Sequence, residues 1–305
     1  MRVVSARSSV THRVGEMWRN RELLGNLTRS DIKVKYKNSA LGVLWSMVAP
    51  LVQLGIYWLV FGVILDNHIP NYVVFLFAGL IVWNFFFGSL TSATGIIVER
   101  AGIVKKVSFP REILSLSCVG AQIFYFAMQA IAFAVVMLIL STSPDWSVIW
   151  LLIPAMAALL VLASAFSVLL SAVNVKLRDT KHLVEIALQL WFWLTPIVYW
   201  YEKIAAKLAA NFGVLKWLYL MNPVTPIVLT FQRIFYPHVQ VVSTIKLPVG
   251  TPRTTVNSGI ITLLPTWSPA TYAMLDCAVL AAAAAVLYFA IWVFGRLEGN
   301  FAEEL

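Results

Sequence analysis

Charged residues are scarce in this sequence: Asp, Glu, Lys and Arg make up 12% of the chain, whereas 60% is hydrophobic. Ordinary soluble domains carry about 25% charged residues, so a soluble fold could not hide this much apolar surface. Each long stretch without charge can hold a helix of roughly 20 residues, the length that a bilayer requires. These stretches lack the strict alternation of barrel strands, so helices remain. We expect an all-α polytopic membrane protein with six transmembrane helices, at about 43–65, 72–93, 114–140, 148–173, 183–201 and 269–294.

Motifs of catalysis and nucleotide binding are also lacking. No loop of the form G-x-x-x-x-G-K-[ST] occurs, and no G-x-G-x-x-G follows a strand. The histidines His12, His68, His182 and His238 are scattered over different loops, which argues against a metal site. Asp276 is the exception to a near absence of acidic residues within the spans, and this absence argues against proton or sodium coupling. We expect Asp276 to reach outward to water or a basic partner, with a functional carboxylate as the alternative, and we expect no catalytic residue and no cofactor in this chain.

Positive charge is unevenly distributed. The net charge of +9 would suit nucleic-acid binding in a soluble protein. Lys and Arg instead gather in 1–42, 93–113, 174–182 and 295–305, while the short connections 66–71 and 141–147 contain none. The positive-inside rule then places both termini in the cytoplasm, and nucleic acid is not an expected partner. No secretory signal peptide is visible, so we expect the first span to act as the insertion signal.

The segment before the first span, residues 1–42, is basic with interspersed apolar residues. Residues 16–38 are typical of an amphipathic segment in the inner headgroup region. Ile32 to Lys37 alternate strictly between apolar and basic, which taken alone favours a strand. We favour a helix, and a solvated basic tail required only for orientation is the alternative.

Residues of about 95–108, between the second and third spans, are expected to form a short amphipathic cytoplasmic helix. Apolar residues recur there near helical spacing, and Pro110 ends the pattern. Either this helix docks a partner protein or it is a simple anchored turn. The charged residues that would contact the partner are Glu99, Arg100, Lys105, Lys106, Arg111 and Glu112.

The region 202–268, after the fifth span, is too apolar for a free loop. Residues 204–220 and 226–235 are too short or too charged to span the bilayer, so they are expected to be a helix pair dipping into the outer interface. Residues 246–268 are rich in Pro, Thr and Gly and are expected to be an irregular external excursion.

Seven strings, in order along nearly the whole chain, resemble the permease subunit of bacterial ABC-2 polysaccharide exporters. They are DIKVKYKNSALGVLW (31–45) with Pro50, FAGL (77–80) leading to WNFF (83–86), VSFPREI (107–113), NVKLRDTKH (174–182), TPIVY (195–199), MNP (221–223) and RLEGNF (296–301). Any one of these strings would be a weak signal, whereas seven in the right topological places are strong. Residues of about 239–267 depart from the family's usual length and are expected to be an insertion.

This resemblance implies a half-transporter in the bacterial cytoplasmic membrane that pairs with a second copy of itself. It further implies two copies of a separate ABC ATPase, which bind ATP and Mg, and a lipid-linked glycan as substrate, of the O-antigen, teichoic-acid, galactan or capsule type. By the same resemblance, residues 95–108 are the coupling helix, 202–268 contain external gate helices, 43–295 form the transmembrane domain and 296–305 are a cytoplasmic tail.

Aromatic residues are abundant, with 12 Trp, 10 Tyr and 18 Phe. Sugars offer C–H faces that stack on aromatic rings, and a path for a long polymer must hold it weakly. By resemblance, spans one and five line the channel. The candidates there are Tyr57, Trp58, Phe61, Trp191, Trp193 and Tyr199, and the alternative for each ring is an interfacial belt or helix packing.

Two other functions stay open at this point. An ABC-2 permease for drugs or lipids would share the same fold, and neighbouring genes for sugar-transfer enzymes would argue against it. A membrane glycosyltransferase or acyltransferase should show clustered acids, bases or metal ligands on one side, and the sequence contains no such cluster.

Overall fold

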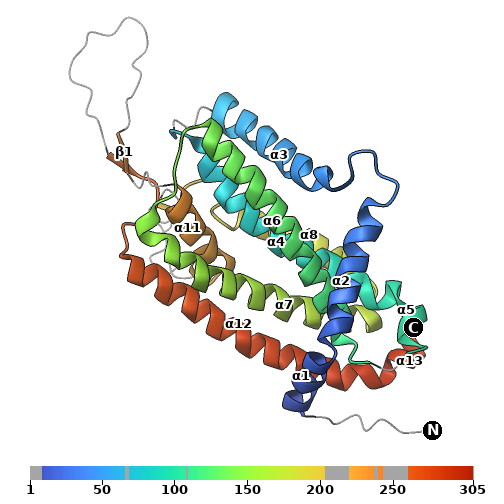
Figure 1. Cartoon of the computed structure of the whole chain (residues 1–305). Coiled ribbons are helices and arrows are strands. Elements are labelled where there is room, and N and C mark those ends of the chain that lie inside the picture. The colour runs from blue at the N-terminus through green and yellow to red at the C-terminus, as the bar shows by residue number, and fades with distance from the viewer. Residues whose placement is uncertain are drawn as a thin grey trace, which may run out of the picture.

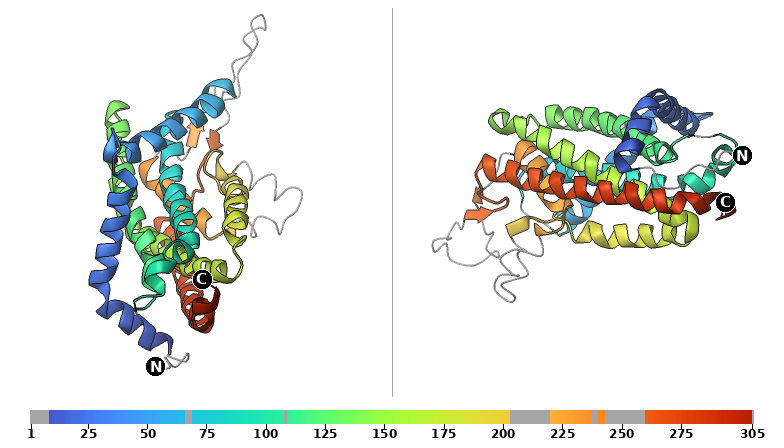
Figure 2. Two further views of the ribbon diagram at one scale, coloured as in Figure 1. Left: turned by 90° about the vertical axis from the view of Figure 1, so that its right-hand side faces the viewer. Right: turned by 90° about the horizontal axis from the view of Figure 1, so that it is seen from below.

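The computed structural model describes residues 9–65, 69–107, 109–202, 220–236, 240–242 and 260–304. Within these ranges the chain is a bundle of long helices (Figure 1). The first and last described helices lie at the same end of the bundle, which we call the terminal end, and the opposite end is the distal end (Figure 2).

Five helices are long and apolar enough to cross a membrane. Span one, Gly42–Ile64, consists of η1 (Gly42–Leu44), α3 (Trp45–Tyr57) and the π-helical η2 (Trp58–Ile64). The others are α4 (Tyr72–Glu99), α6 (Glu112–Ile139), η3 (Trp146–Leu151) continued by α7 (Leu152–Lys176), and α12 (Pro269–Leu297). The protein is therefore an all-α polytopic membrane protein, with spans at five of the six expected ranges.

The fifth expected span, 183–201, is wrong in extent. Its place is taken by α8 (Thr180–Trp193), a helix of 14 residues and about 21 Å. Pro196 explains the early end, because proline has no N–H and disfavours helical geometry in the residue before it. α8 begins at the terminal end and α12 begins at the distal end (Figure 1), so the chain must still cross between them.

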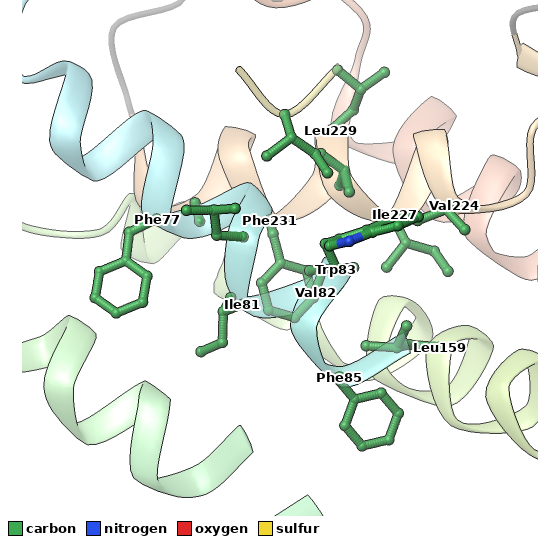
Figure 3. Packing of buried hydrophobic residues seen from close by; sticks show 14 of the residues in the cluster. Phe77, Ile81, Val82, Trp83, Phe85, Leu159, Val224, Ile227, Leu229 and Phe231 are labelled. Carbon is green, nitrogen blue, oxygen red and sulfur yellow. The ribbon is translucent and has the colours of Figure 1, made fainter. Parts of the chain in front are cut away.

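α4 is the central helix of the bundle. It is apolar on all sides, as expected for a helix surrounded by others, and it packs against α6, α7 and α11 (Val224–Phe235). Figure 3 shows Phe77 and Phe85 of α4 among side chains from these neighbours, including Leu159 of α7 and Phe231 of α11. This core fixes the helices that carry the functional surfaces.

The amino-terminal segment is helical, as we favoured. α1 (Val10–Arg19) is capped by Ser9, whose hydroxyl accepts from the His12 backbone N–H, and α2 (Arg21–Tyr36) follows directly. α2 lies across α6, with the Thr28 side chain over Gly120. The alternating pattern of Ile32 to Lys37 was misleading because packing against α6, rather than local pattern, decides its structure.

The expectation of a separate helix at 95–108 is wrong. α4 continues to Glu99, the helix breaks at Arg100, and α5 (Ala101–Val104) is a single turn. Ile97 and Val104 are both buried, so the apolar positions belong partly to the last turn of α4 and partly to α5. We call residues 101–107 the α5 turn.

At the distal end, α11 is buried between other helices rather than lying at the surface. β1 (Gln240–Val242) and β2 (Ile260–Thr262) pair antiparallel, with Val241 opposite Ile261, so the expected insertion 239–267 contains a small ribbon. The expected helix at 204–220 lies outside the described residues apart from Leu220, and so does most of the insertion. At the terminal end the chain finishes with η4 (Glu298–Asn300) and α13 (Phe301–Glu304).

Candidate functional site

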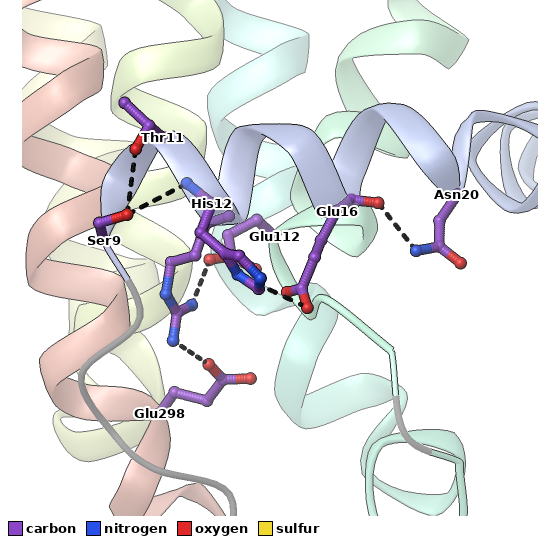
Figure 4. Close-up of polar contacts among 8 residues, drawn as sticks. Ser9, Thr11, His12, Glu16, Asn20, Glu112 and Glu298 are labelled. Atoms are coloured by element: carbon purple, nitrogen blue, oxygen red, sulfur yellow. Dashed lines mark hydrogen bonds and ion pairs between the residues drawn. The ribbon is translucent and has the colours of Figure 1, made fainter.

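A group of ion pairs at the terminal end joins Arg13, Arg111, Glu112 and Glu298, and we call it the Arg13 node. Figure 4 shows Glu112 and Glu298 of this node at the ends of dashed lines that mark these contacts. The Arg13 Nη1 lies 2.5 Å from Glu112 Oε1, and Nη2 lies 2.7 Å from Glu298 Oε2. Arg111 donates to the Glu298 carbonyl oxygen at 3.1 Å. Burial opposes the charged form of Arg13, yet the two carboxylates raise its pKa above the ordinary value. The node joins α1 to the start of α6 and to the residues after α12.

Two further ion pairs tie the end of α4 to its neighbours. Arg100 pairs with Asp31 of α2, which also accepts a 3.2 Å hydrogen bond from Ser117 of α6. Glu99 Oε1 lies 3.0 Å from Lys181 Nζ at the start of α8. The end of α4 is therefore connected both to α2, which leads into span one, and to α8.

The α5 turn offers an exposed surface of mixed character. Lys105 and Lys106 are exposed, and among the described residues neither forms an ion pair. Ile103 and Val107 beside them are 43% and 54% exposed, so apolar and cationic side chains share one surface. Such a composition suits contact with another protein.

The six expected coupling residues therefore separate into two groups. Glu99, Arg100, Arg111 and Glu112 are engaged in pairs within the chain, whereas Lys105 and Lys106 are available to a partner. The expectation for Glu112 is corrected: its side chain is 0% exposed, because it lies beneath Arg13. Arg13 and Lys181 were not anticipated as partners, because nothing in local sequence links positions so far apart.

Span one meets α8 through aromatic rings. Tyr57 stacks on Phe192 with centroids 5.6 Å apart and planes 19° apart, and Phe61 lies 6.3 Å from Trp193. We call these four residues the aromatic contact. Trp193 remains 51% exposed, and Trp58, which follows Tyr57 in the sequence, is 44% exposed. Phe192 was missed by sequence reasoning, although it lies between two candidates.

Trp191 and Tyr199 occupy different surroundings from the aromatic contact. The Trp191 ring packs against Phe86 at 5.3 Å and Phe166 at 5.8 Å, and its indole N–H donates to Asn222 Oδ1 at 2.8 Å. The Tyr199 hydroxyl donates to the Trp193 carbonyl oxygen at 2.7 Å. The structure therefore brings Tyr57, Phe61 and Trp193 together and places Trp191 within the packed interior.

Asn222 fixes the irregular segment that follows α8. Its amide nitrogen donates to Thr195 Oγ1 at 3.0 Å, while its oxygen accepts from Trp191 and from the Val224 backbone N–H at 3.0 Å. An amide side chain can do this because it carries both donor N–H groups and an acceptor oxygen. Buried Gln232 of α11 adds a 3.0 Å bond to the Pro196 carbonyl oxygen. The TPIVY and MNP strings are thus two halves of one structural unit.

Asp276 does not reach outward, which corrects the expectation from sequence. It is fully buried and accepts a 2.8 Å hydrogen bond from Thr230 of α11. The sequence around Asp276 on α12 is apolar and gives no sign of this contact, because the partner belongs to α11, which is distant in the sequence. Within the described ranges, no three His, Cys, Asp or Glu side chains come together as metal ligands would.

Comparison with known proteins gives consistent results. Residues 22–236 match the family model described as ABC-2 type transporter. The chain is 31% identical over 226 residues to the O-antigen export system permease protein RfbA of Myxococcus xanthus, covering 74% of this chain and 84% of that protein. It is also 31% identical over 214 residues to the protein of the same name from Klebsiella pneumoniae, covering 70% of this chain and 80% of that protein.

Proposed function

Because this chain belongs to the ABC-2 type transporter family, as a membrane-spanning transport subunit, we propose that it exports a lipid-linked polysaccharide across the bacterial cytoplasmic membrane. The observation that carries the proposal is the similarity to O-antigen export permeases over 84% of the length of one of them. The aromatic contact supports it, since exposed rings in a membrane-spanning bundle suit the C–H faces of sugars.

The transporter contains two copies of this chain and two copies of a separate ATPase, which binds ATP and Mg. The terminal end faces the cytoplasm, because most of the Lys and Arg outside 202–268 are found there. The α5 turn is the docking surface for the ATPase. Span one exposes large apolar side chains, including Val52, Ile56 and Leu59, which face lipid or the second copy.

Co-expression with the ATPase encoded beside this gene tests the proposal. We expect the purified complex to have the mass of two permeases and two ATPases, and a strain lacking this gene to lose its surface polysaccharide. Chemical analysis of the lost polymer distinguishes O-antigen from teichoic acid, galactan and capsule. Unchanged surface glycan together with retained drug or lipids in the cell would favour a drug or lipid permease, and a complex with one permease copy would refute the two-fold assembly.

A further inference from the structure

A cavity of about 350 Å³ lies between α2, α4, α6 and α8. Lys35 of α2, Lys181 of α8, Ser92 of α4 and Gln122 of α6 are part of its wall. The cavity is separate from the aromatic contact and from the Arg13 node, because its lining shares no residue with either.

The position of Lys35 in this cavity is unusual for a lysine. Its ammonium group lies 4.0 Å from the centroid of the Tyr125 ring. Tyr125 is close to the midpoint of α6 (Glu112–Ile139), which places it roughly 20 Å along that helix from the terminal end. Lys35 is itself exposed, and an ammonium group exposed beside the middle of a membrane-spanning helix is costly unless an anion or water compensates it.

The charges around the cavity leave Lys35 without a counter-ion. Asp31 and Glu99 also line the cavity, but Asp31 is paired with Arg100 and Glu99 is paired with Lys181. Within the described part of the chain no carboxylate pairs with Lys35. The tyrosine ring offers only a weak cation–π contact in place of an anion. One positive charge therefore remains uncompensated.

Neutral donors complete the wall. Gln122 Nε2 donates to Ser92 Oγ at 3.4 Å, which leaves the second Gln122 N–H and the Ser92 hydroxyl hydrogen free to donate into the cavity. A phosphate carries negative charge and several acceptor oxygens, so it matches an uncompensated ammonium beside neutral donors.

We propose that this cavity binds the phosphate group of a membrane lipid, with Lys35 as its principal ligand and Lys181, Ser92 and Gln122 as further donors. Two lipids share this chemistry: an ordinary anionic phospholipid and a phosphate-bearing carrier of the exported glycan. Assignment to the carrier rests on the proposed function, and the binding of a lipid phosphate does not.

Native mass spectrometry of the full chain with its ATPase tests the site, with a polyprenyl monophosphate as probe and the uncharged polyprenol as comparison. We expect the monophosphate to bind better, and Lys35→Gln to weaken its binding about tenfold through loss of a charge-assisted contact. Lys35→Arg should retain binding. Lys33→Gln is the matched control, because it removes the same charge from the same helix at an exposed position outside the cavity wall.

Each outcome decides one question. Equal binding of monophosphate and polyprenol, or equal effects of Lys35→Gln and Lys33→Gln, would overturn the site. Competition by phosphatidylglycerol at equal concentration assigns the site to phospholipid in general, and resistance to it assigns the site to the carrier. Glycan export by the wild-type strain is measured separately. Normal export without phosphate binding refutes the site and leaves the proposed function supported. Phosphate binding without glycan export supports the site and refutes the proposed function.

Discussion

Replacing Arg13 by Met is the most direct test of how the terminal end is held together. The change removes the guanidinium from Glu112, whose Oε1 loses its 2.5 Å partner and whose Oε2 has none among the described residues. Removing one member of a buried ion pair costs about 3–5 kcal/mol, because the other charge stays buried without compensation. We expect about 3 kcal/mol, the lower limit of that range, since Glu298 on the other side of Arg13 is partly exposed and can be hydrated.

Hydrogen exchange of the amides of α1 (Val10–Arg19) measures this loss. If the Arg13 node holds α1 in place, about 3 kcal/mol corresponds to roughly a hundredfold loss of protection. Arg19→Met on the same helix is the control, because Arg19 is exposed and forms no ion pair within the described ranges.

The double variant Arg13→Met with Glu112→Gln separates charge from packing. A neutral amide needs no counter-ion, so we expect the double variant to regain at least half of the lost protection. The reasoning fails if Arg13→Met exchanges like the wild type, or if the second substitution adds to the damage instead of relieving it.

Three further predictions concern other parts of the chain. Trp193→Ala should lower glycan export up to about tenfold while the yield of the complex stays normal. Trp150 is about equally exposed but lies away from the aromatic contact, so Trp150→Ala should not lower export. Equal effects of the two substitutions would assign both rings to packing. Reversing the charge of the two exposed lysines of the α5 turn should lower co-purification of the ATPase, mainly by slowing its association, and an unchanged yield and ATPase activity would remove docking from this turn. Ser147 and then Arg233 hold the pKa of Asp145 below its usual range, so the anchoring of α11 through the 2.8 Å Arg233–Asp145 pair should persist at neutral pH and be lost only as pH falls below about 3.9. The protection factors of the α11 amides, corrected for intrinsic exchange at each pH, check this, and in Asp145→Asn they should not change over that range.

The sequence was sufficient for features that depend on local composition. Long charge-free stretches located five spans, because only helices satisfy their own backbone in lipid. It was insufficient where a distant segment decides the outcome. The α8 boundary, the α5 turn and the burial of Asp276 each depend on packing between segments far apart in the chain.

The candidate site shows the same division. Tyr57, Phe61 and Trp193 were found from composition and resemblance, and the structure brings them together. Trp191 looked equivalent in sequence, but its indole N–H is directed to Asn222, about thirty residues later. One hydrogen bond between distant residues thus distinguishes two tryptophans that local sequence cannot separate.

If the ATPase docks at the α5 turn as proposed, the ion pairs at the end of α4 offer a physical route from it to span one and α8. A force on the α5 turn acts next to Glu99 and Arg100, and these two residues contact Lys181 and Asp31. Lys181 lies in the first turn of α8, and Asp31 belongs to α2, which leads into span one. Span one and α8 are the elements that carry the aromatic contact. The pairs are only partly exposed at Arg100 and about half exposed at Glu99, so the link to span one should be stiffer than the link to α8. Movement of the α5 turn would then displace span one against α8 and change the aromatic contact between them.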